Sequence, residues 1–260
     1  MISYVLSILK FIFWLPVSNK DKVELYQERI RQLEWNAIKP YITKQATFLD
    51  VGCGAGFSLM KAYSELECEI QGIDPEPGAH GVGRFTDGLW KERPIIQGTA
   101  ESLPFPDASF DIVYSSHVLE HVNSEKQALQ EMKRVLKPGG VLIIGMPTSS
   151  MAWVALLSAW FFTTHITIYH CLRSIGKSDF KNRLLRIFIP TSHSFPRANI
   201  ITYDLLHYRK SYWRSILGKH FNIKQQITPG LYPYPDYIQW FPLIKKGGLS
   251  SSVFFICGKD

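Results

Sequence analysis

The chain has 260 residues, of which 46% are hydrophobic and 20% charged, so it can bury one sizeable core and is not a disordered or low-complexity polymer. Residues 1–147 carry 15 Lys and Arg against 18 Asp and Glu, a net charge of −3, whereas residues 148–260 carry 14 against 4, a net charge of +10. The basic half favours an anionic partner such as phosphate, a membrane surface or nucleic acid.

The chain begins with an apolar segment over residues 1–20. Its hydrophobic side chains share one helical stripe: Ile2, Val5, Leu6, Leu9, Ile12 and Phe13. The stripe is too short to span a bilayer, and it lacks the positive start and the small-residue cleavage site of a secretory signal. It predicts a membrane-contacting helix, and docking of that helix on its own domain is the alternative.

Residues 21–147 alternate apolar runs with helical patterns. Asp21 and Glu24 have capping-box spacing at the start of one predicted helix, and Ser124 with Gln127 opens another, which Pro138 ends. Strands are predicted at Thr47–Val51, Glu69–Ile73, Pro94–Gln97, Phe110–Ser115 and Val141–Gly145. This alternation predicts an α/β fold with a mostly parallel sheet and helices on both faces.

Residues 148–200 form an apolar and basic insertion after the fifth predicted strand. No charged residue lies between Lys137 and Arg173, and Met151–Leu172 is strongly apolar. A single membrane crossing is excluded because strands on both sides of the insertion must join one sheet. The apolar run with a basic collar after it predicts peripheral contact with an anionic leaflet, and a buried lid or a dimer surface are the alternatives.

Residues 201–260 are expected to complete the sheet and to supply a substrate loop. A helix is predicted from about Tyr203 to Leu217, followed by strands at Phe221–Thr228 and Ser251–Cys257 that close the sheet as an antiparallel pair. The four cysteines, Cys53, Cys68, Cys171 and Cys257, contain no Cys-x-x-Cys pair, so reduced thiols in a cytosolic protein are expected.

The motif that carries chemistry is Leu49–Gly56, which ends a predicted strand and opens a helix. Its glycines have G-x-G-x-G spacing, and Phe57 stands where a dinucleotide fingerprint needs glycine, so a nicotinamide or flavin cofactor is disfavoured. Asp74 ends the second strand, where a carboxylate can accept both ribose hydroxyls of a nucleoside. The two features predict a nucleoside ligand without pyrophosphate.

These segments resemble class I S-adenosyl-L-methionine-dependent methyltransferases, in the branch of ubiquinone and menaquinone biosynthesis enzymes (methyltransferase domain 11). Within residues 45–147 five motifs match in order: Leu49–Gly56, Gly72–Asp74, Gly98–Phe105, Phe110–Val122 and Leu136–Gly140. The resemblance implies a Rossmann-like, seven-stranded fold and S-adenosyl-L-methionine as the cofactor.

The resemblance also implies which residues bind the cofactor. They are expected near the carboxyl ends of the strands: Asp50, Gly52, Cys53, Gly54, Asp74, Pro75, Ala100, Glu101, Ser115 and Ser116. Asp50 and the glycine backbone would hold the methionine end and Asp74 the ribose. Ala100 and Glu101 would flank the adenine, and the two serines would line the sulfonium side. Thr99 departs from the acid that the family usually has there.

His117 and His121 are the candidate catalytic residues, because a histidine near neutral pKa can accept a proton from the methyl acceptor. Their sequence also matches the H-x-x-E-H signature of zinc peptidases. That signature belongs on a long helix, whereas these residues are predicted in a strand-to-helix turn, so no metal site is predicted. Packing or capping of a helix is the alternative role for His121.

The sequence therefore predicts transfer of a methyl group to an amphipathic small molecule, a lipid or a lipid-linked sugar. The enzyme is expected in the cytoplasm, peripherally on the inner face of a membrane. One alternative is an RNA methyltransferase that uses the basic half, although Ser-Ser-His-Val after the fourth strand differs from an N-P-P-Y motif. The other alternative is a non-catalytic, membrane-associated assembly factor.

Overall fold

A seven-stranded sheet forms the centre of the computed structural model, which describes residues 20–78, 95–158, 201–232, 243–244 and 249–259 together with residues 181 and 184. Its strands are β1 (Thr47–Val51), β2 (Glu69–Asp74), β3 (Ile96–Gln97), β4 (Phe110–Ser116), β5 (Leu136–Pro147), β6 (Asn222–Ile227) and β7 (Ser252–Gly258). The spatial order is β3-β2-β1-β4-β5-β7-β6. Only β7 runs in the direction opposite to the other strands of this sheet. The predicted mostly parallel sheet with a closing antiparallel pair is therefore confirmed.

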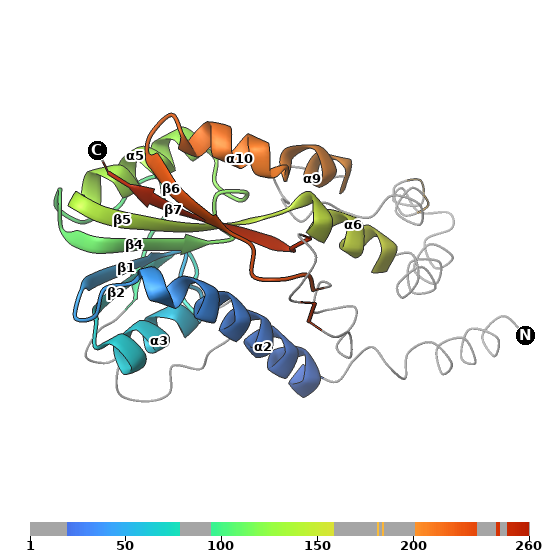
Figure 1. Ribbon diagram of the computed structural model, residues 1–260, viewed down its shortest axis with the longest axis horizontal. Helices are drawn as coiled ribbons and strands as arrows, with labels where there is room; N and C mark the ends of the chain where they lie inside the picture. Colours follow the sequence, from blue (N-terminus) through green and yellow to red (C-terminus); the bar gives the residue numbers. More distant parts are fainter. Residues whose placement is uncertain are drawn as a thin grey trace, which may run out of the picture.

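Helices cover both faces of this sheet, with α2 and α3 on one side and α5 and α10 on the other (Figure 1). The helical segments are α2 (Lys20–Ile38), the 3-10 turn η1 (Lys39–Tyr41), α3 (Phe57–Leu66), α5 (Glu125–Val135), α6 (Ser149–Ser158), α9 (Ile201–His207) and α10 (Lys210–Leu217). Successive residues of a strand point to opposite faces. Ile143 accordingly packs in the core under α2 and α3, whereas Leu142 and Ile144 pack in the core under α5 and α10.

The start of α5 follows from its sequence. The Ser124 side chain accepts a hydrogen bond from the Gln127 backbone N–H at 3.3 Å, as the predicted cap requires. Leu129 and Met132 are fully buried against the sheet. For α2, the helix begins at Lys20, and the side chains of residues 20–23, including the predicted cap at Asp21, lie outside the described side chains.

The strand predicted at Val141–Gly145 is longer in the structure. β5 begins at Leu136, directly after α5, because Leu136 pairs with Phe110 before the register shifts ahead of Val141. Gly139 has a φ of 76° within this segment, which accommodates the irregularity. The helix therefore ends at Val135, before Pro138 and Gly139, and these two residues lie within β5 instead of stopping the helix or forming a separate loop.

The single helix predicted from Tyr203 to Leu217 is wrong, because the chain forms α9 and α10 with a break at Tyr208 and Arg209. Arg209 has extended backbone angles and caps α10. The Tyr208 carbonyl accepts a hydrogen bond from the Ser149 N–H at 2.9 Å, so it serves the start of α6 instead of continuing its own helix. Tertiary contact has overridden the local helical pattern.

Most of the insertion, and the N-terminal segment apart from Lys20, lie outside the described residues. Of the run Met151–Leu172, the structure describes the part in α6, and of the loop Leu231–Trp240 it describes Leu231 and Tyr232. Among the residues that are described, no helix combines the length and apolar character needed to cross a membrane. Cys53, Cys68 and Cys257 are buried free thiols, as expected, and Cys171 lies outside the described ranges.

Candidate methyl-transfer site

The glycine turn after β1 has a backbone that other residues adopt only with strain. Gly52, Gly54 and Gly56 all have positive φ values, of 77°, 52° and 82°. A Cβ atom on Gly52 would also lie 2.3 Å from Val118 Cγ2, in the turn that follows β4. The glycines thus let the chain turn sharply at the carboxyl edge of the sheet, and Gly56 leads directly into α3.

Asp74, the predicted ribose ligand, lies at the end of β2 and holds this glycine turn in place. Its Oδ2 accepts a hydrogen bond from the Gly54 N–H at 2.7 Å, and its Oδ1 accepts one from the Glu76 N–H at 2.8 Å. The backbone N–H of Gly52 donates to the Ile73 carbonyl at 2.8 Å. The carboxylate therefore supports the loop as well as standing where a ribose is expected.

Asp50 is the most unusual acid of this edge. It is buried at the end of β1, and its Oδ2 has no hydrogen-bond partner among the described residues. Burial raises the pKa of Asp50 to about 7; the charge of Asp74 adds to the increase, while a hydrogen bond with Ser58 and the charge of Arg31 oppose it. A buried carboxylate oxygen without a partner is suited to an incoming ammonium group.

The predicted adenine-side residues lie near β3 and at the start of α5. The Pro75 carbonyl accepts a hydrogen bond from Gln97 Nε2 at 3.1 Å, which links the ends of β2 and β3. Ala100 is buried, and Glu101 Oε1 accepts a hydrogen bond from the Asn123 N–H at 2.8 Å. This hydrogen bond links Glu101 to the segment that leads into α5.

The two serines at the end of β4 differ in their surroundings. Ser115 is buried, and its hydroxyl donates to the Val51 carbonyl at 3.0 Å, which ties β4 to β1 just before the glycine turn. Ser116 is partly buried and pairs with Gly145 of β5. A Cβ on Gly145 would lie 2.4 Å from the Phe254 ring and 2.9 Å from Ser116 Oγ, so the glycine makes room for both side chains.

The structure separates the two candidate catalytic histidines. His117 follows β4 directly, with a left-handed φ of 57° and its N–H donating to the Gly145 carbonyl at 2.9 Å. His121 is exposed at the end of the following turn. Residues 117–121 form this turn and no helix, as predicted. His117 thus lies at the buried edge of the site, and His121 does not.

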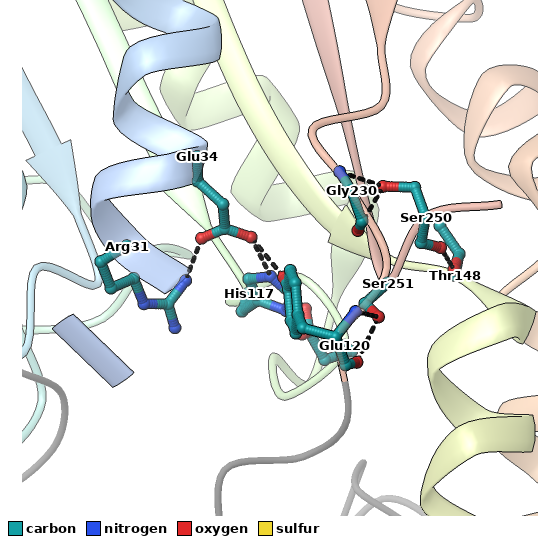
Figure 2. A network of polar contacts seen from close by, with 9 residues as sticks. Arg31, Glu34, His117, Glu120, Thr148, Gly230, Ser250 and Ser251 are labelled. Carbon is teal, nitrogen blue, oxygen red and sulfur yellow. Dashed lines mark hydrogen bonds and ion pairs between the residues drawn. The ribbon is translucent and has the colours of Figure 1, made fainter. Parts of the chain in front are cut away.

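His117 lies between two buried carboxylates (Figure 2). Its Nε2 is 3.5 Å from Glu34 Oε1, and its Nδ1 is 3.5 Å from Glu120 Oε1. Burial alone would lower the pKa of His117, but the carboxylates of Glu120 and Glu34 outweigh this effect and raise it. A general base must be neutral, so this environment works against the predicted proton-accepting role.

Glu34 comes from α2 and was not recognised in the sequence. Its Oε2 accepts a hydrogen bond from Arg31 Nη1 at 2.7 Å, and its Oε1 accepts one from the Tyr232 hydroxyl at 2.5 Å. Burial would raise the pKa of Glu34, but Arg31, His117 and Tyr232 together hold it well below its usual range. The available signal was a carboxylate one turn after Ile30, on the apolar face of a predicted helix.

Tyr232 is held by a second set of hydrogen bonds next to β7. Its backbone N–H donates to Ser251 Oγ at 2.9 Å, and the Ser251 hydroxyl donates back to the Tyr232 carbonyl. Ser250 pairs in the same way with Gly230, and its carbonyl accepts from the Thr148 hydroxyl at the end of β5 (Figure 2). The segment after β6 is thereby fixed beside α2.

Comparison with known proteins identifies the domain. Residues 49–144 match the model of the family described as Methyltransferase domain (Methyltransf_11). Residues 49–144 thus form a methyltransferase domain. The demethylmenaquinone methyltransferase of Renibacterium salmoninarum is 40% identical over 99 residues, which are 37% of this chain and 39% of that protein.

Another relative is named for a different substrate. The tRNA U34 carboxymethyltransferase of Saccharophagus degradans is 30% identical over 133 residues, 47% of this chain and 39% of that protein. The chain thus spans about two-fifths of the length of these curated relatives. A SAM-dependent methyltransferase structure from Thermotoga maritima has a TM-score of 0.53 and 19% identity, covering 91% of this chain and 92% of that one, which shows a shared fold.

The residues of this methyltransferase domain fit S-adenosylmethionine as the cofactor. The glycine turn lies at the carboxyl edge of the sheet, where open α/β folds place their ligands. The free oxygen of Asp50 suits the ammonium of the methionine part, and the carboxylate of Asp74 suits the ribose. When bound, the cofactor supplies an electrophilic methyl group on a positively charged sulfur. The protein then has to place an acceptor in line with that group.

Proposed function

We propose that this protein transfers a methyl group from S-adenosylmethionine to an amphipathic acceptor, such as a small molecule, a lipid or a lipid-linked sugar, at or near a membrane. The cofactor edge described above supports the transfer. Apolar surface at the same end of the sheet supports the choice of acceptor, and this surface is the observation that carries the proposal.

The apolar surface consists of Trp153 and Leu157 on α6 and Leu206 on α9. Their side chains are 55%, 49% and 57% exposed. α6 begins two residues after the carboxyl end of β5, and its Ser149 hydroxyl donates to the Leu205 carbonyl of α9 at 3.3 Å. Figure 1 shows both helices beyond the same end of the sheet. Large apolar side chains exposed together on two adjacent helices are typical of an interaction surface.

The charge of the C-terminal half supports a membrane as the partner of this surface. Residues 148–260 carry a net charge of +10, and each basic residue near an anionic leaflet contributes roughly 1 kcal/mol of attraction. Apolar burial combined with such attraction is sufficient for peripheral binding. We therefore propose a cytoplasmic protein that binds peripherally to the inner face of a membrane.

An RNA acceptor is the second candidate, because the same basic half could bind phosphates and one relative is named as a tRNA enzyme. Exposed Trp and Leu side chains favour the membrane over RNA, since RNA-binding surfaces need basic groups next to the bases they stack. The two candidates differ in what the apolar residues contribute to binding.

Vesicle sedimentation separates the two candidates. Wild type should bind vesicles with anionic lipid and be released by salt. A Trp153→Asp, Leu157→Asp double variant and a deletion of residues 1–16 should each bind less. Tyr63→Asp, an exposed aromatic change on α3, is the matched control and should bind like wild type. Wild type that stays in the supernatant at low salt while binding a single-stranded RNA would reverse the choice of acceptor.

A further inference from the structure

The ring of His117 has a buried carboxylate beside each of its two nitrogens. Glu34 and Glu120 are each 1% exposed. The nearby groups also include Arg31 and Tyr232, as well as Tyr114 and Asp50 farther along β4 and β1. The two tyrosines stay neutral because burial, their largest influence, raises the pKa of each. The charged groups that act on His117 are Arg31, Glu34 and Glu120, whereas Asp50 on β1 is not among them.

Charge balance decides the state of His117. With Glu34 and Glu120 both ionised, Arg31 compensates one of the two carboxylates, so a neutral imidazole would leave the cluster with one uncompensated buried negative charge. An imidazolium brings the cluster to zero. Leaving a buried charge without its partner costs more free energy than protonating a histidine near neutral pH.

The backbone at His117 also shows that its surroundings determine its position. A left-handed φ in a residue other than glycine is strained and persists only where neighbouring contacts enforce it. Here the N–H bonds to Gly145 of β5, while the ring is bracketed by α2 and by the turn after β4. Three elements thus fix one side chain at the edge where methyl transfer is proposed.

We propose that Glu34 and Glu120 are positioning residues that hold His117 as an imidazolium at the methyl-transfer edge, and that the acceptor is an acidic molecule that reacts as its anion. The inference rests on the proposed function for the place of the reaction. His117 then supplies positive charge beside the acceptor and does not remove its proton.

This assignment specifies the class of acceptor. Phenols and enols flanked by carbonyl groups, or carboxylic acids, lose their proton in solution and need no base in the site. The acceptor's lone pair forms the new bond to the methyl carbon while the carbon–sulfur bond breaks and leaves its electron pair on sulfur. An anion and a sulfonium give two uncharged groups, so no proton is left over. An alkylammonium acceptor would instead meet an imidazolium and is disfavoured.

The test measures the protonation of His117 directly, in the full chain and without a substrate. In isotope-labelled protein, the His117 ring signal is identified by its loss in His117→Gln and is followed by NMR against pH. The wild-type midpoint should lie above the ordinary histidine value of about 6.5. Glu34→Gln and Glu120→Gln should each lower it by about one pH unit, a tenfold change in proton affinity.

Two further variants keep the test decisive. Glu28→Gln removes an exposed acid from the same helix and should leave the midpoint unchanged. Arg31→Gln removes the competing cation and should raise the midpoint, which is the opposite sign to the two glutamate variants. The proposal is overturned by a wild-type midpoint at or below about 6.5, or by glutamate variants that behave like Glu28→Gln. Calorimetry with S-adenosylhomocysteine tests the proposed function separately, because failure to bind it would leave the titration interpretable.

Discussion

The two sides of the candidate site are built in different ways. On the cofactor side, Asp50, Gly52 and Asp74 lie within 25 residues of one another, on adjacent strands and the turn between β1 and α3. On the acceptor side, the hydrogen bond from Tyr232 to Glu34 joins residues 198 positions apart. The first side is a local motif on a sheet edge, where open α/β folds place ligands. The second depends on the complete fold.

This difference predicts where single changes act. A change on the cofactor side should remove cofactor binding and leave the rest of the molecule folded. A change on the acceptor side should alter stability and protonation with little effect on cofactor affinity.

Gly52→Ala should have the largest effect. The new methyl group would clash with Val118 Cγ2 at 2.3 Å and would also require a φ of 77° in a residue other than glycine. We expect binding of S-adenosylhomocysteine, measured by calorimetry, to weaken by more than about 1000-fold. The glycine turn cannot keep its conformation when both the contact with Val118 and the backbone strain oppose it.

Gly139→Ala is the matched control for this change. Gly139 has a similar φ of 76°, but nothing lies within 4 Å of its Cβ position. It should cost only about 1 kcal/mol of stability, from backbone strain, and leave cofactor affinity as in wild type. Equal losses of binding in the two variants would show that strain, and not the contact with Val118, determines the result.

Asp74→Ala should cause the second-largest loss of cofactor affinity. It removes the acceptor of the Gly54 N–H and the carboxylate that is expected to receive the ribose hydroxyls. Wild type should bind S-adenosylhomocysteine in the micromolar range, and the variant about 100-fold more weakly, since charge-assisted hydrogen bonds contribute about 1.5–3 kcal/mol each. Glu76→Ala, an exposed neighbour, is the control. A folded Asp74→Ala protein with unchanged affinity, or tighter binding of NAD than of S-adenosylhomocysteine, would refute the cofactor assignment.

The cofactor side was predictable because its determinants are short-range. Positive φ at Gly52 and Gly54 demands glycine, and the strands on either side are apolar runs with clear ends, so the motif is visible in the sequence. β1 was predicted with its observed bounds, and β2 and β4 are each one residue longer than predicted. The helix cap at Ser124 was predictable for the same reason, because its hydrogen bond joins Ser124 to Gln127, three residues along the chain.

The acceptor side was not predictable in the same way. Glu34 has the spacing of a core position on α2, but nothing near it in the sequence indicates that His117 and Tyr232 complete its surroundings. The break between α9 and α10 has a similar cause, because it depends on Tyr208 meeting Ser149. His121 was proposed because of its type and its closeness in sequence to His117, and only the turn geometry shows that it is exposed.

The third-largest effect should come from Asp50, in the pH dependence of S-adenosylhomocysteine binding. Its pKa is raised to about 7, chiefly by burial, and the ammonium of the ligand should favour the ionised form. Binding of S-adenosylhomocysteine should therefore weaken about 30-fold from pH 8 to pH 5.5, as the ionised fraction falls. Binding near pH 6 should release protons, which calorimetry detects as a dependence of the enthalpy on the buffer.

Asp50 should affect the stability of the ligand-free protein in the opposite direction to its effect on binding, so that stability falls as pH rises. A folded-state pKa above the unfolded one means that the native state holds the extra proton, so this contribution to the free energy of unfolding falls as pH rises from about 4 to about 7. Acids whose pKa is lowered in the fold, such as Glu34 and Asp111, act in the other direction at lower pH. The contribution of Asp50 is isolated by comparing the free energy of unfolding of wild type and Asp50→Asn as a function of pH. Identical pH profiles for the two proteins would contradict the expected contribution.

The smallest effects should come from two tyrosines of one hydrophobic cluster. Tyr26 and Tyr232 pack together with Ile30 and are both buried. The Tyr232 hydroxyl donates to the Glu34 carboxylate at 2.5 Å, whereas the Tyr26 hydroxyl has no hydrogen-bond partner among the described residues. Tyr232→Phe should lower the free energy of unfolding by about 1.5 kcal/mol, because it leaves a buried carboxylate oxygen with one bond fewer.

Tyr26→Phe should change the free energy of unfolding by less than about 0.5 kcal/mol, or raise it slightly, because it removes a buried hydroxyl that forms no compensating bond. Urea unfolding at pH 7 measures both variants, with cofactor affinity followed in parallel. Since both substitutions remove one oxygen from the same cluster, loss of packing would affect them equally. Equal costs would show that the cluster acts only through its apolar contacts, whereas the expected difference assigns the stability to the hydrogen bond that joins Tyr232 to α2.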